Sequence, residues 1–188
     1  MPKEQFYIGI PTRNLSANIP SIVKVMFASF LMDKMPSVTV SDSSTVCMAR
    51  SSICHEIKIK ATNKNVERVL WLDSDIFIDN TPEELATVFM EADKQHKNIV
   101  GFYNLADKRG SMTAFDDTNI DFAKFRELEQ FTSVKFAGLG FYYGDTPLNY
   151  RFHESYNAGE DFNFFIDNKI EIVVDKRIIL HHNKNMFI

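Results

Sequence analysis

The chain has 188 residues, which suits a single domain. Its hydrophobic fraction of 45% is normal for a soluble globule, and its 17 phenylalanines indicate a core rich in aromatic side chains. A net charge of −4, without any Lys/Arg cluster, argues against a nucleic-acid-binding protein, which usually carries a basic surplus.

The apolar segments and the two cysteines bear on where the protein works. The opening stretch MPKEQFYIGIP lacks the apolar region of a signal peptide. The longest apolar run, VMFASFLM at residues 25–32, is far shorter than the roughly 20 residues that span a bilayer. Cys47 and Cys54 are separated by about 10 Å of helix rise, too far for a disulfide. We therefore expect a cytoplasmic protein with reduced thiols and no transmembrane segment.

Strands and helices alternate in the first half of the predicted structure. The hydrophobic patterns predict strands at residues 6–10, 37–41 and 68–78, the last broken by an acidic turn. They predict helices at residues 20–34, 45–63 and 81–97. The last of these has the clearest start, because Thr81 and Glu84 suit a capping box around Pro82.

The second half is predicted to contain more strands. They are expected at residues 98–104, as a pair within 134–145, and at 170–174 and 177–182. Short helices are expected at residues 121–131 and 159–168. The whole pattern predicts an α/β fold with helices on the faces of a mixed, mostly parallel sheet. Ligands of such sheets bind beyond the carboxyl ends of strands.

The stretch VLWLDSDIFI, residues 69–78, places two carboxylates at such a strand end. Asp73 and Asp75 repel each other unless a cation lies between them, and Mg²⁺ or Mn²⁺ prefers oxygen ligands of this kind. A solvated acidic turn is the alternative. An EF-hand is disfavoured because the required Gly is missing, and a dehalogenase-type phosphatase because Phe77 replaces the expected Thr or Val.

Five segments together resemble the GT-A fold glycosyltransferases, which use nucleotide-diphosphate sugars. They are IGIPTRN, the helical MARSSICHEIKIKAT, VLWLDSDIFI, FAGLGFYYGD and AGEDFNFFIDNKIEIVVDKRIILHH, in the family's order along nearly the whole chain. The resemblance implies one GT-A-like, Rossmann-like domain over residues 1–188. Its nucleotide-binding half is expected at residues 1–100 and its acceptor-side half at 101–188.

The resemblance also implies a site for Mn²⁺ or Mg²⁺. Asp75 is expected to bind the metal directly, and Asp73 to contact the donor or to reach the metal through water. A histidine after the last strand is expected to complete the site, and spacing from Asp175 favours His182 over His181. The two point to opposite faces of a strand, so only one can face the metal.

Glu160 and Asp161 are the catalytic candidates. The resemblance implies that Asp161 takes a proton from the acceptor hydroxyl, supported by Glu160, or the reverse. A retaining enzyme would use them to bind sugar hydroxyls instead. The alternative is structural, since carboxylates at the start of a helix are stabilised by its dipole.

The donor-binding candidates follow the strand ends. Arg50 could instead form a salt bridge across its helix. Gly138 and Gly140 could instead form a β-bulge. The implied set is Pro11, Thr12, Arg13, Asn14, Asp42, Arg50, Asp73, Ser74, Asp75, Gly138 and Gly140.

The expected function is metal-dependent transfer of a sugar from a nucleotide-diphosphate sugar to an acceptor hydroxyl on a glycan, lipid or protein. The alternative is a non-catalytic module of the same fold that binds a nucleotide sugar or a glycan. The sequence leaves the donor, the acceptor and the stereochemistry open.

Overall fold

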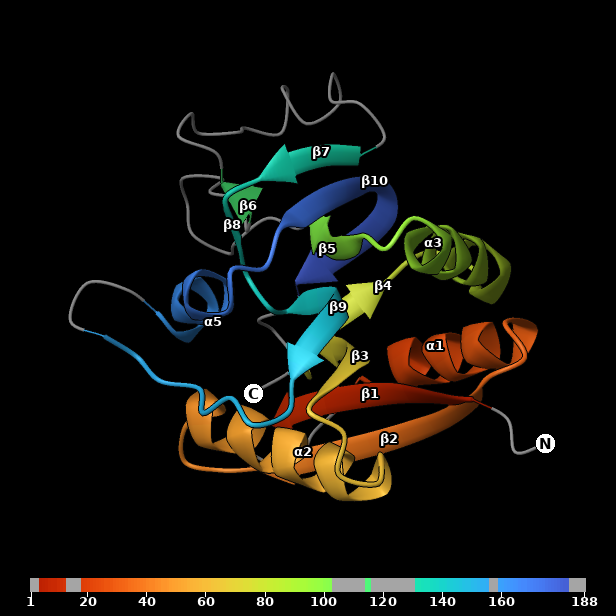
Figure 1. The fold of residues 1–188 in the computed structure, drawn as a ribbon. Coiled ribbons are helices and arrows are strands. Elements are labelled where there is room, and N and C mark those ends of the chain that lie inside the picture. The colour runs from red at the N-terminus through yellow and green to blue at the C-terminus, as the bar shows by residue number, and fades with distance from the viewer. Residues whose placement is uncertain (1–3, 13–17, 103–113, 116–130, 156–158, 183–188) are drawn as a thin grey trace, which may run out of the picture.

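An eight-stranded mixed sheet forms the centre of the molecule (Figure 1). The computed structural model describes residues 4–12, 18–102, 114–115, 131–155 and 159–182. The strand order is β2-β1-β3-β9-β5-β10-β4, and β7 also pairs with β10. The strands are β1 (Gln5–Thr12), β2 (Met35–Asp42), β3 (Val66–Leu72), β4 (Ile76–Ile78), β5 (Asn98–Phe102), β7 (Phe131–Val134), β9 (Phe141–Pro147) and β10 (Ile172–His182). A separate two-stranded sheet pairs β6 (Ala114–Phe115) with β8 (Phe136–Ala137).

Strand direction brings several carboxyl ends to one edge of the sheet. β1 is parallel to both β2 and β3, and β10 is parallel to β5. β9 lies antiparallel between β3 and β5, so β3 and β5 point the same way. β4 and β7 are antiparallel to β10. The predicted mixed α/β sheet is therefore confirmed, and β9 joins the two halves of the chain into one sheet.

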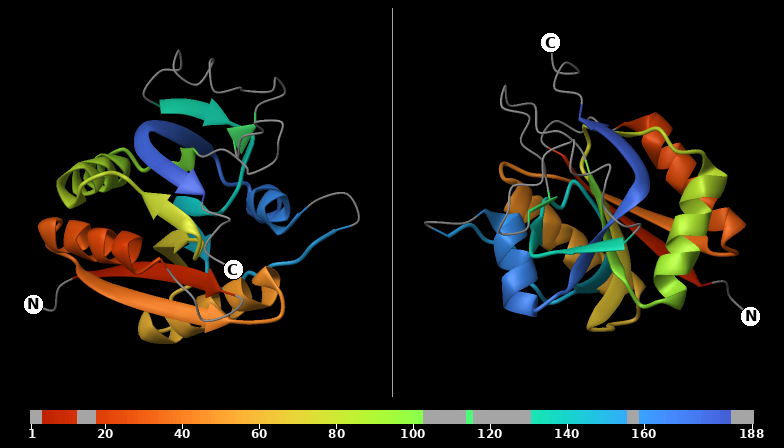
Figure 2. Two further views of the ribbon diagram at one scale, coloured as in Figure 1. Left: turned by 180° about the vertical axis from the view of Figure 1, so that it is seen from behind. Right: turned by 90° about the horizontal axis from the view of Figure 1, so that it is seen from above.

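Four described helices cover both faces of the sheet. Figure 2 shows α1 (Ile19–Leu31) and α3 (Pro82–Lys94) on one face, and α2 (Val46–Lys60) and α5 (Glu160–Asn168) on the other. The first layer packs Val25 and Phe89 against Ile8 and Leu70 of the sheet. Aromatic side chains are frequent in the second layer, where Trp71, Tyr142 and Phe164 pack together with the apolar face of α2. The predicted aromatic core is thus divided between the two layers.

Side-chain caps fix where the helices begin. Thr81 accepts a hydrogen bond from the Glu84 N–H, and the Glu84 carboxylate accepts one from the Thr81 N–H, which forms the predicted capping box of α3. Thr45 caps α2 by accepting from the Met48 N–H at 3.2 Å. Asn18 caps α1 in the same manner. Each cap satisfies an N–H group that has no partner within its helix.

Gly9 allows α2 to lie directly on β1. A Cβ atom at this position would lie 2.9 Å from both Ile53 Cγ2 of α2 and Trp71 Cζ3 of β3. Only glycine fits such a close approach of helix and strand without movement of a neighbour. This packing sets the height of α2, and therefore of its polar side chains, above the sheet.

The structure corrects some predicted elements. Residues 170–174 and 177–182, expected as two strands, belong largely to the single strand β10, whose register with β5 shifts between Val174 and Ile179. In the irregular stretch, the buried Asp175 carboxylate accepts hydrogen bonds from the backbone and guanidinium of Arg177. The predicted strand 68–78 is divided into β3 and β4, which pair with different partners.

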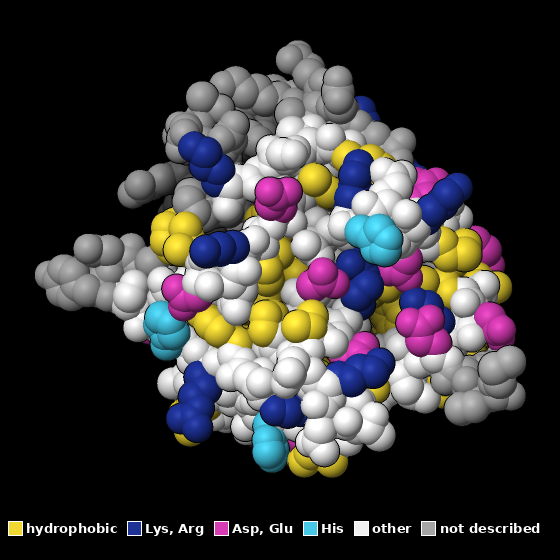
Figure 3. Space-filling view, viewed as in Figure 1, with side chains coloured by type: hydrophobic (Ala, Val, Ile, Leu, Met, Phe, Trp, Pro, Cys, Tyr) yellow, Lys and Arg dark blue, Asp and Glu magenta, His cyan; other side chains and the backbone are white. Residues whose placement is uncertain are grey.

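The structure also bears on the predicted helix at residues 121–131, on the two cysteines and on the expected absence of a membrane-spanning helix. The helix expected at 121–131 lies outside the described residues, except for Phe131, which begins β7. Cys47 and Cys54 are free thiols, as predicted. None of the helices in the described ranges combines the length and apolar character needed to cross a membrane. On the face shown in Figure 3, acidic and basic side chains are interspersed with hydrophobic ones.

Candidate functional site

A buried arginine lies at the centre of the predicted site. Arg50 projects from α2 and is only 1% exposed. Its Nη1 atom donates to Glu160 Oε1 and to Asp161 Oδ1, both at 2.6 Å, and its Nη2 atom donates to Asp73 Oδ1 at 2.7 Å. The expected alternative of a salt bridge across the helix is not what forms. Arg50 instead joins the acidic turn after β3 to the first turn of α5.

The acidic turn is held in place by backbone hydrogen bonds on two sides. The Asp73 N–H donates to the Gly140 carbonyl at 2.9 Å, and the Ile76 N–H closes the turn by donating to the Asp73 carbonyl. On the other side, the Asn18 N–H donates to the Ser74 carbonyl at 3.0 Å. The Asn18 side chain donates to the Ile76 carbonyl. The segments before α1 and before β9 therefore meet at the acidic turn.

Asp161 has the perturbed acidity expected of a candidate base. Burial raises its pKa to about 6, and the neighbouring carboxylates of Asp73 and Glu160 add to this increase. The Arg50 guanidinium and a hydrogen bond from the Leu139 N–H act in the opposite direction. Leu139 lies between Gly138 and Gly140, so this glycine-flanked turn contacts both Asp161 and the acidic turn.

Negative charge exceeds positive charge at this point. Within the described residues, Arg50 is the cation that forms ion pairs with Asp73, Glu160 and Asp161, and Asp75 follows two residues after Asp73. The carboxylates raise the pKa of Arg50, so its charge is permanent. In the described part of the chain, Asp73 Oδ2 has no hydrogen-bond partner. A hard divalent cation such as Mg²⁺ or Mn²⁺ prefers carboxylate oxygens, but among the described residues the ligand atoms of Asp73, Glu160 and Asp161 do not all lie within 4.8 Å of one another.

His181 and His182 end β10, which pairs with β4. The backbone register pairs His182 with Ile76, next to Asp75, and pairs His181 with Phe77. The exposed His181 ring makes a hydrogen bond through Nε2 to the Asp79 carboxylate. Asp79 follows β4, whereas the acidic turn precedes it. The side chain of His182 lies outside the described atoms. The preference for His182 over His181 as the metal ligand therefore stays a prediction.

Two residues that the sequence did not single out lie beside Glu160. The Cys47 thiol donates to Glu160 Oε2 at 3.0 Å. Ligand atoms of Cys47, Glu154 and Glu160 lie within 4.8 Å of one another. Burial and the hydrogen bond to Glu160 raise the pKa of the Cys47 thiol to about 12, so it is protonated at neutral pH. Its position one helical turn before Arg50 was the signal that could have identified it.

The remaining predicted donor-binding residues are spread along the sheet edge. Pro11 and Thr12 end β1 and are buried, and Thr12 pairs in register with Asp42 at the exposed end of β2. Asp42 therefore lies one strand further from the acidic turn than Thr12 does. Arg13 and Asn14 lie outside the described residues.

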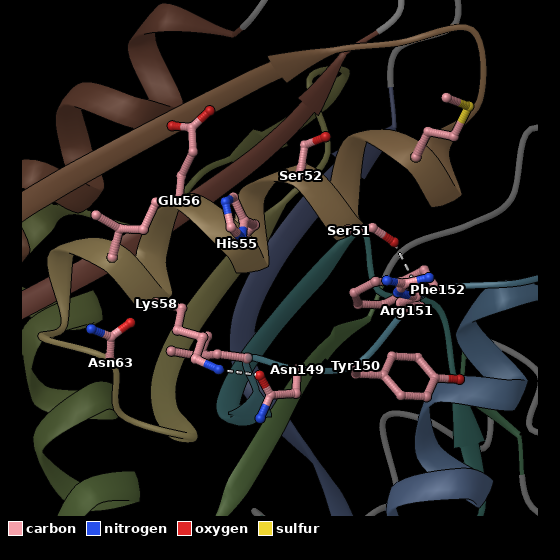
Figure 4. A pocket seen from close by; sticks show the side chains of 13 residues that line it. Ser51, Ser52, His55, Glu56, Lys58, Asn63, Asn149, Tyr150, Arg151 and Phe152 are labelled. Carbon is pink, nitrogen blue, oxygen red and sulfur yellow. Dashed lines mark hydrogen bonds between the residues drawn. The ribbon is translucent and has the colours of Figure 1, made fainter.

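A pocket of about 830 Å³ lies along the outer side of α2 (Figure 4). Its walls come from α2 and from residues 148–152, and the Phe152 N–H donates to Ser51 Oγ across one end. Polar side chains such as His55, Asn149 and Arg151 line it. The residues that line the pocket include none of the predicted site residues, and Arg50 of the same helix is buried beneath the carboxylates instead.

Comparison with known proteins does not assign the chain to a family. No family model matches the sequence, and no curated protein matches it. The functional conclusion therefore rests on the chemistry of the site.

Proposed function

We propose that the protein is a metal-dependent glycosyltransferase with a GT-A-like fold. It would move a sugar from a nucleotide-diphosphate sugar to a hydroxyl group of a glycan, lipid or protein acceptor. The observation that carries this proposal is the convergence of Asp73, Glu160 and Asp161 on Arg50, beside Asp75 at the carboxyl edge of the sheet. Free Cys47 and Cys54 support a reducing, cytoplasmic setting for the reaction.

The chain's own residues suit distinct tasks in this reaction. Asp73 and Asp75, with His182, would hold Mn²⁺ or Mg²⁺, which when bound neutralises charge on a leaving diphosphate. Asp161 would accept the proton of the acceptor hydroxyl, because a carboxylate with a pKa near 6 is largely ionised at neutral pH and is a stronger base than an ordinary one. Arg50 orients Asp161 through the 2.6 Å contact and holds Glu160 beside it.

Calorimetry with UDP and GDP, with and without Mn²⁺, tests the donor half of the proposal. We expect a nucleoside diphosphate to bind in a Mn²⁺-dependent manner and Asp75→Ala to abolish that binding. The matched control is Asp167→Ala, which removes an exposed carboxylate from the other end of α5. Unchanged Mn²⁺-dependent binding by Asp75→Ala would refute the proposed metal site.

One observation favours the alternative of a non-catalytic binding module. Arg50 contacts both carboxylates that are candidates for the base, Glu160 and Asp161, which reduces their tendency to accept a proton. Slow hydrolysis of UDP- or GDP-sugars distinguishes the two functions. A transferase releases free sugar at a rate that falls in Asp161→Asn, whereas a binding module releases none.

A further inference from the structure

The outer face of α1 is apolar along its whole length. A surface helix normally places polar residues on the side away from the core, but α1 has the sequence IPSIVKVMFASFL, with Lys24 as its only charged residue. Large hydrophobic side chains occupy its solvent side, with Ile19 67% exposed and Phe27 57% exposed. Val23, Phe30 and Leu31 are also exposed. A helix that is apolar on all sides is expected to be covered on all sides.

The contacts of α1 define the direction of this face. On one flank, Ser21 Oγ accepts from the Ile78 N–H at 3.0 Å, and Lys24 Nζ donates to the Ile78 carbonyl at 2.6 Å. That flank therefore faces β4. At 100° per residue, Ile19 and Phe30 lie on the opposite flank, and Val23 and Phe27 lie on the outside between the two. The apolar face consequently extends away from β4, toward the side of the sheet where β2 lies.

β2 is an edge strand without the usual protection. It pairs with β1 on one side, and no described strand pairs with its other side. Edge strands of this length usually carry inward-pointing charges or prolines that block further pairing. Here the only proline and the only charged residue, Pro36 and Asp42, lie near the two ends, and the central residues read SVTVS. Among the described strands, none occupies this edge of β2.

The helix face and the strand edge form one surface. Pro36, Val38 and Val40 pair with Phe6, Ile8 and Ile10, whose side chains pack in the core layer on the α1 side of the sheet. Val40 is 43% exposed on that side. Because α1 follows β1 and runs back to the start of β2, its first residue, Ile19, lies at the same end of the sheet as Val40. An apolar surface therefore continues from the edge strand onto the helix.

We propose that this surface, defined by the outer face of α1 and the free edge of β2, joins two copies of the chain. The two β2 strands would pair antiparallel about a two-fold axis. That arrangement keeps α1 and its counterpart on the same face of a continuous sheet, with their apolar faces opposed. A second copy is the partner that supplies both a matching strand edge and a matching apolar helix at once.

The buried area is adequate for such a dimer. Six half-exposed hydrophobic side chains, the five on α1 with Val40, remove on the order of 500 Å² of surface per protomer, about 1,000 Å² in total, which reaches the lower limit for a specific interface. Pairing of the β2 strands adds backbone hydrogen bonds to this area. An anionic bilayer is a poorer occupant, because such surfaces attract helices bordered by several basic residues and Lys24 is already bonded to backbone.

Light scattering during size exclusion, over a wide range of protein concentrations, tests the proposal. We expect a mass of twice 21.7 kDa that falls toward the monomer on dilution. The double variant Ile19→Glu/Phe30→Glu should raise the dissociation constant about thirtyfold or more, because charges would be buried at the centre of the contact. Hydrogen exchange at the amides of residues 37–41 should slow as the concentration of the unmodified chain rises.

The matched control carries two charges on the opposite face of the sheet. Ile59 of α2 is 61% exposed, and Ile166 of α5 is exposed as well, so Ile59→Glu/Ile166→Glu should remain dimeric. A wild-type chain that is monomeric at every concentration would overturn the proposal. Persistence of the dimer in the α1 double variant would overturn it too. A monomer that binds neutral phosphatidylcholine vesicles through α1 would identify a bilayer as the occupant instead.

Discussion

Nη2 of Arg50 lies 2.7 Å from Oδ1 of Asp73, so the interior of α2 is bonded directly to the first residue after β3. The same guanidinium contacts Glu160 and Asp161 at the start of α5. Three parts of the chain that are distant in sequence therefore share one positive charge. Its removal leaves three carboxylates without their common partner.

Arg50→Met should destabilise the protein strongly. Loss of one partner from a buried ion pair typically costs about 3–5 kcal/mol, because the remaining charges stay desolvated. The exposed Arg151→Met is the control and should change the free energy of unfolding by less than about 0.5 kcal/mol. Urea denaturation of both variants measures the difference. Equal stability of the two variants would show that Arg50 does not hold the site together.

Asp161→Asn should alter how stability depends on pH. In the folded protein the pKa of Asp161 is raised to about 6, above the usual value of an aspartate, so the folded state binds the proton more tightly than the unfolded state. This carboxyl group's contribution to stability is greatest below pH 4 and is lost as the pH rises toward 6. Asp161→Asn has no such titrating group. As the pH rises over this range in metal-free buffer, the wild-type protein should therefore lose stability relative to the variant.

Asp167→Asn provides a control of opposite sign. Hydrogen bonds from His153 and Tyr150 lower the pKa of Asp167, so its contribution is present above its unfolded pKa and is lost as the pH falls through the folded pKa. Thermal unfolding at closely spaced pH values measures both variants. If the two differences from wild type follow the same trend with pH, the assigned environment of Asp161 is wrong.

Gly9→Ala should destabilise by about 1–3 kcal/mol through overpacking. The new methyl group would lie 2.9 Å from Ile53 and from Trp71, so α2 must move away from the sheet. The control is Gly159→Ser, where a Cβ atom meets nothing within 4 Å and a serine suits the N-cap of α5. Chemical denaturation should separate them, and similar stability of both variants would contradict the close packing at Gly9.

Asn80→Ala should loosen the contact between the loop after β4 and β10. The buried Asn80 side chain accepts from the Ile179 N–H at 2.7 Å and donates to the Arg177 carbonyl at 2.8 Å. The variant removes two partly buried hydrogen bonds to the backbone of β10, at a cost of about 1–3 kcal/mol in total. If His182 is a metal ligand, Mn²⁺ affinity should also fall.

The exposed Asn149→Ala is the control for the change at Asn80. Its hydrogen bonds are to other exposed side chains, so both stability and Mn²⁺ affinity should stay near wild type. Denaturation and Mn²⁺ titration of the two variants test these points separately. A stability loss at Asn80 without any change in Mn²⁺ affinity would exclude a role for the β4–β10 contact in binding the metal.

Local sequence signals predicted the helices well, because their determinants lie within a few residues. Thr81 and Glu84 marked the start of α3, and both caps form as expected. Pairing between β4 and β10 could not be read from either segment, because Asn80 and Ile179 are 99 residues apart. For the same reason the sequence predicted two strands where the irregular but continuous β10 forms around the buried Asp175.

The sequence predicted which acidic residues belong to the candidate site, but it did not predict how they contact one another. Asp73, Glu160 and Asp161 were each named as candidate site residues, and the structure brings them together around Arg50. The shared contact of Arg50 was not foreseen, since an arginine in mid-helix has several possible partners nearby. Cys47 was missed because its apolar character suggested core packing, although its thiol bonds to Glu160.

The late position of β10 in the chain has a consequence for synthesis. β4 has β10 as its partner strand, and that partner leaves the ribosome about a hundred residues after β4 does. Until then the segment around Asp73 and Asp75 lacks the strand that pairs with β4, and before β9 emerges it also lacks the Gly140 carbonyl. The nascent protein therefore completes the surroundings of its aspartate turn only when translation has reached the last described strand.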